Sequence, residues 1–378
     1  MQRSVKLAIP LEDMDDCVLE TIRIYNSISN QHVYYALKNK ACSKNTLHKA
    51  LYKGIRTKYP DFPSALVQCA RDHAVGMLKG NGKKAKTVKN PLSGIRFDLR
   101  TCKVFLESGS MNLATVDGRK RINFNVPEYF QKYASWEVKG CVVGVHKRFL
   151  FIHVVVDGET PTVQTGKVLG IDRGLKNFVV CSNGIQVRGN HIRCVKRRYA
   201  YLRRRLQACG TRNAINHLKV LAGRERRFMQ DVNHTLSKRI AGTDYNVFAL
   251  EDLTGIRKGN KGRRFNRMRS NWAFFQFQKF LEYKAESLGK SVVYVDPRFT
   301  SQRCCVCGFV AKANRHNGLF HCKSCGRFDN ADLNASVNIS QLGQALVEQA
   351  TVNQPIPAGN DGNTALHLSS TRVGSHTF

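Results

Sequence analysis

The N-terminal part of the chain changes from an alternating to a helical pattern of apolar residues. Residues 3–9 alternate polar and apolar side chains, with Val5, Leu7 and Ile9 in phase, which predicts a β-strand. From residue 13 to about residue 78 the apolar positions recur every three or four residues. This segment therefore predicts three or four helices in a small bundle.

An alternating pattern of polar and apolar residues returns further along the chain. Between residues 95 and 156, short alternating segments separated by turn residues predict a series of β-hairpins. With the first strand added, residues 1–10 and 93–160 are predicted to form a β-barrel, interrupted by the helical insertion of residues 11–92. The lysine-rich stretch 79–90 has almost no apolar residue, so we predict a linker there, although its charge also suits phosphate contact.

Two apolar runs in the second half end in a carboxylate. Asp172 follows the strand-like run 168–171, and Glu251 follows the run 247–250. A carboxylate at the end of a buried strand lies at the edge of a sheet, where strand ends commonly build sites. Between the two runs, Asn183-Gly184 is typical of a two-residue hairpin turn.

Two Cys-x-x-Cys pairs follow, with 14 residues between them. Their spacing is typical of a zinc ribbon, because four thiolates complete a tetrahedral structural zinc site. Cys305 and His321 are spare candidate ligands. Two disulfides are the alternative, but they need an oxidising compartment, and the N-terminus offers no signal-peptide core. The four predicted zinc ligands are Cys304, Cys307, Cys322 and Cys325.

Asp332 comes directly after this ribbon and opens an apolar-periodic helix. Asp is also a preferred helix cap, so this stretch alone leaves capping and chemistry equally open. Three carboxylates brought together repel one another unless divalent cations lie between them. Asp172, Glu251 and Asp332 thus suit a two-metal phosphodiester nuclease.

Charge points to a polyanionic partner. Lys and Arg number 61 against 27 acidic residues in 378, a net charge of +34. The first basic helix, 196–206, carries no acid, and its arginines cannot all share one face, so we predict that nucleic acid contacts it from several sides. A glycine-rich basic loop follows Glu251. The predicted nucleic-acid-binding residues are Arg197, Arg198, Arg203, Arg204, Arg205, Arg263 and Arg264.

The loop leads into an aromatic helix, whose rings at helical spacing suit a core better than stacking on bases. No apolar run reaches the ~20 residues of a membrane span. The 13 cysteines suit a reducing interior, and residues 351–378 predict a disordered tail. We therefore expect a cytoplasmic protein without membrane contact.

Several motifs in order resemble the TnpB (OrfB) proteins of bacterial and archaeal insertion sequences, which are relatives of compact type V CRISPR effectors. The resemblance runs from about residue 167 to residue 339. The motifs are Gly170-Ile171-Asp172-Arg173-Gly174, Leu250-Glu251-Asp252-Leu253, Thr300-Ser301-Gln302 and Asp332-Leu333-Asn334-Ala335, with Asn233-His234 and Tyr283-Lys284 between them.

This resemblance implies an α+β multidomain RNA-guided DNA endonuclease, acting as a monomer or a homodimer. Its RuvC-like (RNase H-type) α/β nuclease domain would comprise residues 166–303 and 327–350, with the zinc ribbon of 304–326 inserted. Asp172, Glu251 and Asp332 would be the catalytic acids and would hold Mg²⁺ or Mn²⁺. Guide RNA and target DNA would be the partners, and a short flanking motif would complete target choice.

One position departs from the family pattern. TnpB proteins usually have an arginine immediately before the third acid, where this chain has Ala331. A guided DNA-binding repressor that has lost its nuclease therefore stays an alternative. A transposase is a further alternative, disfavoured by the ribbon between the second and third acids.

Overall fold

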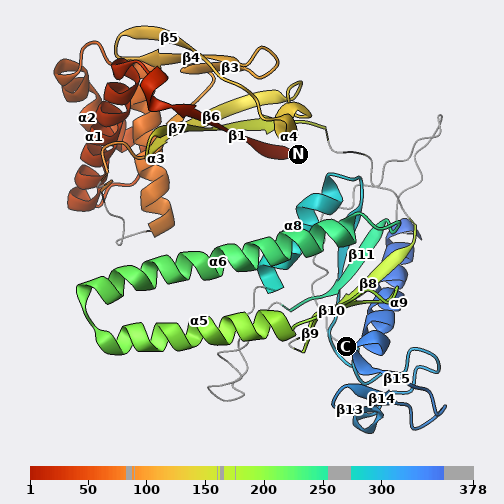
Figure 1. Ribbon diagram of the computed structural model, residues 1–378. Coiled ribbons are helices and arrows are strands. Elements are labelled where there is room, and N and C mark those ends of the chain that lie inside the picture. The colour runs from red at the N-terminus through yellow and green to blue at the C-terminus, as the bar shows by residue number, and fades with distance from the viewer. Residues whose placement is uncertain are drawn as a thin grey trace, which may run out of the picture. The chain divides into compact units, whose positions relative to one another are not determined.

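The computed structural model describes residues 1–81, 87–88, 90–159, 161, 166–174, 176–253 and 274–352 (Figure 1). These residues form two compact units, Met1–Glu159 and Thr160–Phe378. The predicted tail beyond residue 352, the basic loop with Arg263 and Arg264, and most of the predicted linker lie outside the described residues.

The first unit contains two antiparallel sheets. The predicted N-terminal strand is confirmed, and it pairs with the last strand of the unit, Val5 opposite Val154. The four-stranded sheet has the order β1 (Gln2–Pro10), β7 (Phe149–Asp157), β6 (Glu137–His146) and β2 (Ile95–Phe97). The three-stranded sheet has the order β3 (Cys102–Phe105), β4 (Ser110–Thr115) and β5 (Gly118–Asn123).

Three long helices follow β1, as the helical spacing predicts. They are α1 (Asp16–Asn39), α2 (Lys44–Lys58) and α3 (Ser64–Asn81). Ser43 caps α2, because its side chain accepts a hydrogen bond from the Thr46 amide at 3.1 Å. Two short elements, η1 (Leu11–Asp13) and α4 (Glu128–Gln131), complete the unit.

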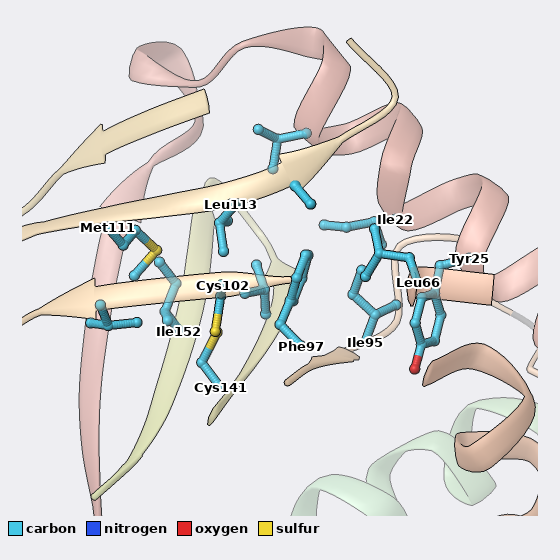
Figure 2. Close-up of a cluster of buried hydrophobic side chains, with 14 of the residues drawn as sticks. Ile22, Tyr25, Leu66, Ile95, Phe97, Cys102, Met111, Leu113, Cys141 and Ile152 are labelled. Atoms are coloured by element: carbon cyan, nitrogen blue, oxygen red, sulfur yellow. The ribbon is translucent and has the colours of Figure 1, made fainter. Parts of the chain in front are cut away.

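The strands and helices of the first unit share one core (Figure 2). Phe97, Leu113 and Ile152 come from three strands and are at most 4% exposed. They pack with Ile22 of α1 and Leu66 of α3, both fully buried. The helical insertion is thus part of the same hydrophobic core as the strands, which is why it folds with them.

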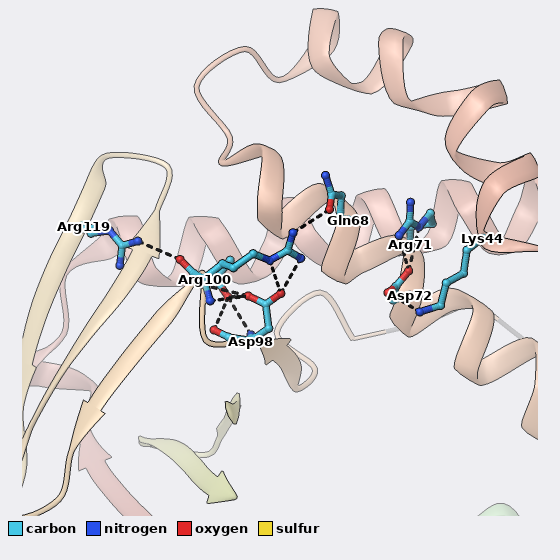
Figure 3. Close-up of polar contacts among 8 residues, drawn as sticks. Lys44, Gln68, Arg71, Asp72, Asp98, Arg100 and Arg119 are labelled. Carbon is cyan, nitrogen blue, oxygen red and sulfur yellow. Dashed lines mark hydrogen bonds and ion pairs between the residues drawn. The ribbon is translucent and has the colours of Figure 1, made fainter. Parts of the chain in front are cut away.

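Charged side chains tie the helices to the strands at the surface of this unit (Figure 3). The Arg100 guanidinium donates to Asp98 at 2.7 and 2.9 Å and to Gln68 of α3 at 3.0 Å. Asp72 of α3 accepts from Lys44 of α2 at 2.7 Å. The Arg100 contacts hold the turn between β2 and β3 against α3, and the Lys44–Asp72 pair joins α2 to α3.

The second unit contains a five-stranded mixed sheet. β8 pairs parallel with β11 and antiparallel with β9, and β11 pairs parallel with β12. The predicted turn at Asn183-Gly184 joins β9 to β10, and Gly184 has a φ of +87° there. The order is β10 (Gln186–Arg188), β9 (Asn177–Cys181), β8 (Val168–Asp172), β11 (Val247–Glu251) and β12 (Ser291–Val295).

Helices cover both faces of this sheet, as expected for buried parallel strands. Phe248 and Leu250 of β11 face the core that includes α6 (Arg212–Ala241) and α8 (Phe274–Glu286). Val247 and Ala249 face α9 (Ala331–Val352) instead. The continuous apolar run in β11 therefore reflects burial on both sides.

A small three-stranded sheet lies between β12 and α9 along the chain. Its strands are β13 (Arg315–His316), β14 (Leu319–His321) and β15 (Phe328–Asn330), preceded by η4 (Lys312–Asn314). α5 (Asn190–Cys209) forms a long antiparallel hairpin with α6 (Figure 1). Within the described part of the chain, no helix combines the length and apolarity needed to cross a membrane.

Candidate active site and metal centre

Two of the three predicted acids lie at the ends of neighbouring strands. Ile171 of β8 pairs with Leu250 of β11, so the last residues of these strands, Asp172 and Glu251, lie side by side. Arg173, only 7% exposed, donates from its guanidinium to the Glu251 carbonyl at 2.6 Å. This bond fixes the two strand ends relative to each other.

Asp332 reaches the same edge of the sheet from α9. Its carboxylate accepts a hydrogen bond from Asn177 of β9 at 2.8 Å and forms an ion pair with Arg315 at 2.8 Å. The helix cap is Asn330 instead, whose side chain accepts from the amides of Asp332 at 2.9 Å and Leu333 at 3.2 Å. The capping alternative for Asp332 is therefore wrong, and its carboxylate bonds Asn177 and Arg315 instead of the helix amides.

A close helix–strand contact sets this placement. A Cβ added to Gly170 of β8 would lie 2.0 Å from the Ser336 carbonyl and 2.4 Å from the Ser340 amide of α9. Gly343 of α9 makes a similar approach, with its added Cβ 2.5 Å from that of Ala249. The two glycines let the helix backbone lie directly on the sheet, which places Asp332 near Asp172.

The acids influence one another electrostatically. Burial, together with the negative charges of Glu251 and Asp332, raises the pKa of Asp172 to about 7, while Arg315 acts in the opposite direction. Burial also raises the pKa of Glu251, opposed by a hydrogen bond from Thr300 at 2.5 Å. The sheet edge is thus a half-buried site with an excess of negative charge.

Arg315 and Asn177 are site residues that the sequence does not identify, and Thr300 is singled out only as part of a motif. Arg315 comes from β13 of the ribbon and still contacts the acid cluster. Its guanidinium bonds Asp332, the acid whose neighbour Ala331 replaces the usual arginine. No spacing rule links Arg315 to Asp332, because only the folded ribbon brings them together.

The four predicted zinc ligands converge. The sulfur atoms of Cys304, Cys307, Cys322 and Cys325 all lie within 4.8 Å of one another. The Cys304–Cys325 sulfurs are 3.7 Å apart and the Cys307–Cys322 sulfurs 3.5 Å. Zn–S bonds of ~2.3 Å in a tetrahedron place sulfurs about 3.8 Å apart, so this set fits a structural zinc ion.

The two Cys-x-x-Cys turns have matching backbones. Gly308 and Gly326 have φ values of +73° and +71°, and their amides donate to the carbonyls of Cys304 and Cys322 at 3.0 and 3.1 Å. Backbone amides of Cys325 and Ser324 lower the pKa of Cys322 to about 6, which favours the thiolate that binds metal.

The spare candidates lie outside this set. Cys305 is half-buried, and its amide donates to the Asn334 side chain at 3.1 Å. The His321 ring packs edge-on against Phe328. Asp329, a further carboxylate near the site, forms an ion pair with Arg327 at 2.6 Å.

As predicted, the five arginines do not all share one face of α5, but four of them do. Arg197, Arg198, Arg204 and Arg205 are all exposed and, at spacings of one and seven residues, lie on one face. Arg203 lies on the opposite face and forms an ion pair with Glu225 of α6. The outward face of α5 is therefore the charged surface.

The aromatic helix α8 divides its rings between core and surface. Phe277 is 1% exposed in the core, as predicted, whereas Phe275 is 58% exposed. Phe280 stacks on His234 of α6 at 3.8 Å between ring centroids.

Two family models match parts of the chain. The OrfB_IS605 model, described as "Probable transposase", matches residues 151–255, and the Cas12f1-like TNB domain matches residues 274–339. Together these segments contain all three acids and all four clustered cysteines.

Among the curated relatives are a Cas12f1 nuclease and a TnpB-like protein. The CRISPR-associated endodeoxyribonuclease Cas12f1 of Sulfoacidibacillus thermotolerans is 30% identical over 52% of this chain and 50% of its own length. The TnpB-like protein MJ0751 of Methanocaldococcus jannaschii is 36% identical over 32% of this chain and 46% of its own. The chain thus matches about half the length of each of these two relatives.

A solved structure shares the fold. The Cas12f1 chain in a Cas12f1-sgRNA-target DNA complex aligns with a TM-score of 0.60 at 16% identity, over 86% of this chain and 83% of that one. The mixed α/β architecture is therefore that of a known structural group. The matches confirm that the chain is related to the TnpB (OrfB) family and to the compact type V CRISPR effectors, as its motifs predict.

Proposed function

We propose that this protein is an RNA-guided DNA endonuclease of the RuvC-like type. The observation that carries the proposal is that Asp172 and Glu251 end the paired strands β8 and β11, and that Asp332 of α9 lies close enough for its charge to raise the pKa of Asp172. The strand order β10-β9-β8-β11-β12, with helices on both faces, supports an RNase H-type domain. Relatives named as endodeoxyribonucleases add independent support.

The three acids would hold divalent cations, Mg²⁺ or Mn²⁺. Clustered carboxylate oxygens are the ligands that these hard cations prefer. Bound there, the ions would supply Lewis-acid stabilisation of the charge that develops during phosphodiester hydrolysis. Burial and repulsion disfavour a negative charge on Asp172, and such cations would stabilise that charge.

Other residues of the chain would orient the acids. Arg315 and Asn177 bind the two oxygens of Asp332, and the Thr300 hydroxyl donates to Glu251. Arg315 places a guanidinium beside Asp332, where Ala331 offers none. This replacement favours an active nuclease over the guided repressor.

The remaining assignments follow the same proposal. The first unit would combine a barrel-like strand domain with the helical insertion, and the ribbon would bind zinc through its four cysteines. A guide RNA and a target DNA would be the partners, in keeping with the net charge of +34. The protein would act in the cytoplasm of a bacterium or archaeon, as a monomer or homodimer.

The test begins with the RNA that copurifies with the protein. Sequencing that RNA should yield one defined structured species, because charge alone would retain random RNA. The protein with this RNA should then cut a matched DNA when Mg²⁺ is present. Asp172→Ala, Glu251→Ala and Asp332→Ala should each reduce cutting to background and leave target binding nearly unchanged.

Asp329→Ala is the matched control, because Asp329 pairs with Arg327 and lies outside the set. It should cut at nearly the wild-type rate. Normal cutting by Asp332→Ala would remove Asp332 from the proposed set. A wild-type protein that binds its matched target with Mg²⁺ and never cuts would be the guided repressor.

A further inference from the structure

The outward face of α5 has a regular arrangement of side chains. Arg197 and Arg198 are followed seven residues later by Arg204 and Arg205, and Tyr201 lies midway between the two pairs. At 3.6 residues per turn, all five project from one side of the helix, over an arc of about 120°. All five are exposed, and α5 contains no acidic residue.

The protein itself leaves this face unoccupied within its described residues. No described residue forms an ion pair or hydrogen bond with any of the four arginines, whereas Arg203 on the opposite face binds Glu225. The Tyr201 side chain is 51% exposed, and the Arg205 guanidinium lies 5.9 Å from its ring centroid.

We propose that this face is a site for an unpaired nucleotide strand, on which a base stacks against Tyr201 while the arginine pairs hold phosphates on either side. Aromatic rings bind single strands by stacking on the base face, and arginines track the backbone. Seven residues of helix rise about 10.5 Å, close to three nucleotide steps at ~3.4 Å each. The two pairs therefore reach phosphates about three steps apart, and the middle one of the three nucleotides between them lies at Tyr201.

The Tyr201 ring favours an unpaired strand over a duplex as the ligand of this face. In a duplex the base faces are covered by their neighbours, so an exposed tyrosine on a convex helix cannot stack on them. Four arginines alone would hold the duplex backbone equally well, with or without Tyr201. The tyrosine between the pairs thus selects unpaired nucleotides, of RNA or of DNA.

This inference deepens the proposed function and rests on it only for the kind of partner. Its test measures binding without cleavage, so failure of the nuclease proposal would not affect the result. The probes are fluorescein-labelled oligouridine, oligothymidine and a DNA hairpin duplex. They are titrated by anisotropy into the full protein after a high-salt wash has removed bound nucleic acid.

Tyr201→Ala should weaken binding of the single strands by about 5- to 150-fold, the range expected for loss of one stacked base. Duplex binding should change less than twofold, and Tyr201→Phe should bind like wild type. A stronger effect on oligouridine than on oligothymidine would assign the site to RNA, and the reverse to DNA. Alanine is a good helix former, so α5 should stay folded.

Tyr129→Ala is the matched control. Tyr129 is 67% exposed in the first unit, with the Lys132 amine 4.5 Å from its ring centroid, but no arginine pairs flank it. It should leave single-strand binding unchanged. Equal binding by Tyr201→Ala and wild type, or equal loss for single strands and duplex, would overturn the proposal. A wild-type protein that binds none of the probes would overturn nucleic-acid binding as well.

Discussion

The sulfur cluster and the carboxylate cluster are both sets of acidic groups, but they are assembled differently. The four cysteines lie within 22 consecutive residues, and two matching turns present them. The three carboxylates are spread over 161 residues and come from two strands and a helix. The first set depends on local geometry, and the second depends on sheet register and helix packing.

Their energetic roles differ for the same reason. A closed tetrahedral zinc site contributes folding free energy directly. A half-buried group of carboxylates opposes folding, since burial and mutual repulsion disfavour their charges. The ribbon is therefore expected to stabilise the unit, whereas the acids are expected to reduce its stability in return for function.

The largest effect is expected in the sulfur cluster. Cys322→Ser removes one of four thiolates, so zinc content and the yield of folded protein should both fall sharply. Zinc is measured by atomic absorption on purified protein. Cys305→Ser, next to the cluster but outside it, should keep both at wild-type level. Full zinc occupancy in Cys322→Ser would show that four cysteines are not required.

The contribution of the acid cluster to the stability of the fold should fall as the pH rises. The pKa of Asp172 is raised to about 7, from ~3.9 in an unfolded chain. Its contribution to stability is thus fully present below pH 4 and is lost as pH rises to about 7. Without added divalent cations other than zinc, wild type should lose about 4 kcal/mol more than Asp172→Asn between pH 4 and pH 8.

Urea unfolding of both proteins across this pH range measures the difference. Asp244→Asn is the control, because Asp244 is an exposed acid of the same unit and its removal should leave the profile unchanged. Parallel profiles for wild type and Asp172→Asn would mean that ionised Asp172 is not disfavoured.

The packing that joins the acids should be sensitive to one methyl group. In Gly170→Ala the new Cβ would lie 2.0 Å from the Ser336 carbonyl, so α9 must move. We expect a loss of about 1–3 kcal/mol in the free energy of unfolding, the usual cost of overpacking. Cutting should fall with it, because Asp332 moves with α9.

Gly54→Ala is the matched control for this change. An added Cβ at Gly54 in α2 meets nothing within 4 Å, so this helix should gain about 0.4–1 kcal/mol. An unchanged stability in Gly170→Ala would mean that α9 does not lie against β8 as closely as described.

The smallest effect tests Arg315, the ribbon residue that binds Asp332. Arg315→Gln should lower the cleavage rate about 10- to 100-fold, typical for loss of an outer partner of a metal ligand. Zinc content should not change, since Arg315 is not a ligand. Arg327→Gln, a ribbon arginine paired with Asp329, should cut normally. Wild-type cutting by Arg315→Gln would show that Asp332 needs no positioning partner.

The sequence alone determined the features that depend on near neighbours. The pattern of Val5, Leu7 and Ile9 predicts β1, and the Cys-x-x-Cys spacing predicts the sulfur cluster with its two glycine turns. The motif resemblance also anticipates the two family models that match parts of the chain. Period, turn chemistry and ligand spacing are local properties, so they can be read without the fold.

Only the tertiary structure decided the contacts between distant segments. It shows that Asn330, not Asp332, caps α9, and that Arg315 of the ribbon binds Asp332. It also turns Arg203 toward Glu225 and leaves Arg197, Arg198, Arg204 and Arg205 exposed around Tyr201. These outcomes depend on which elements pack together, and helical periodicity alone does not say which face of a basic helix meets its neighbour.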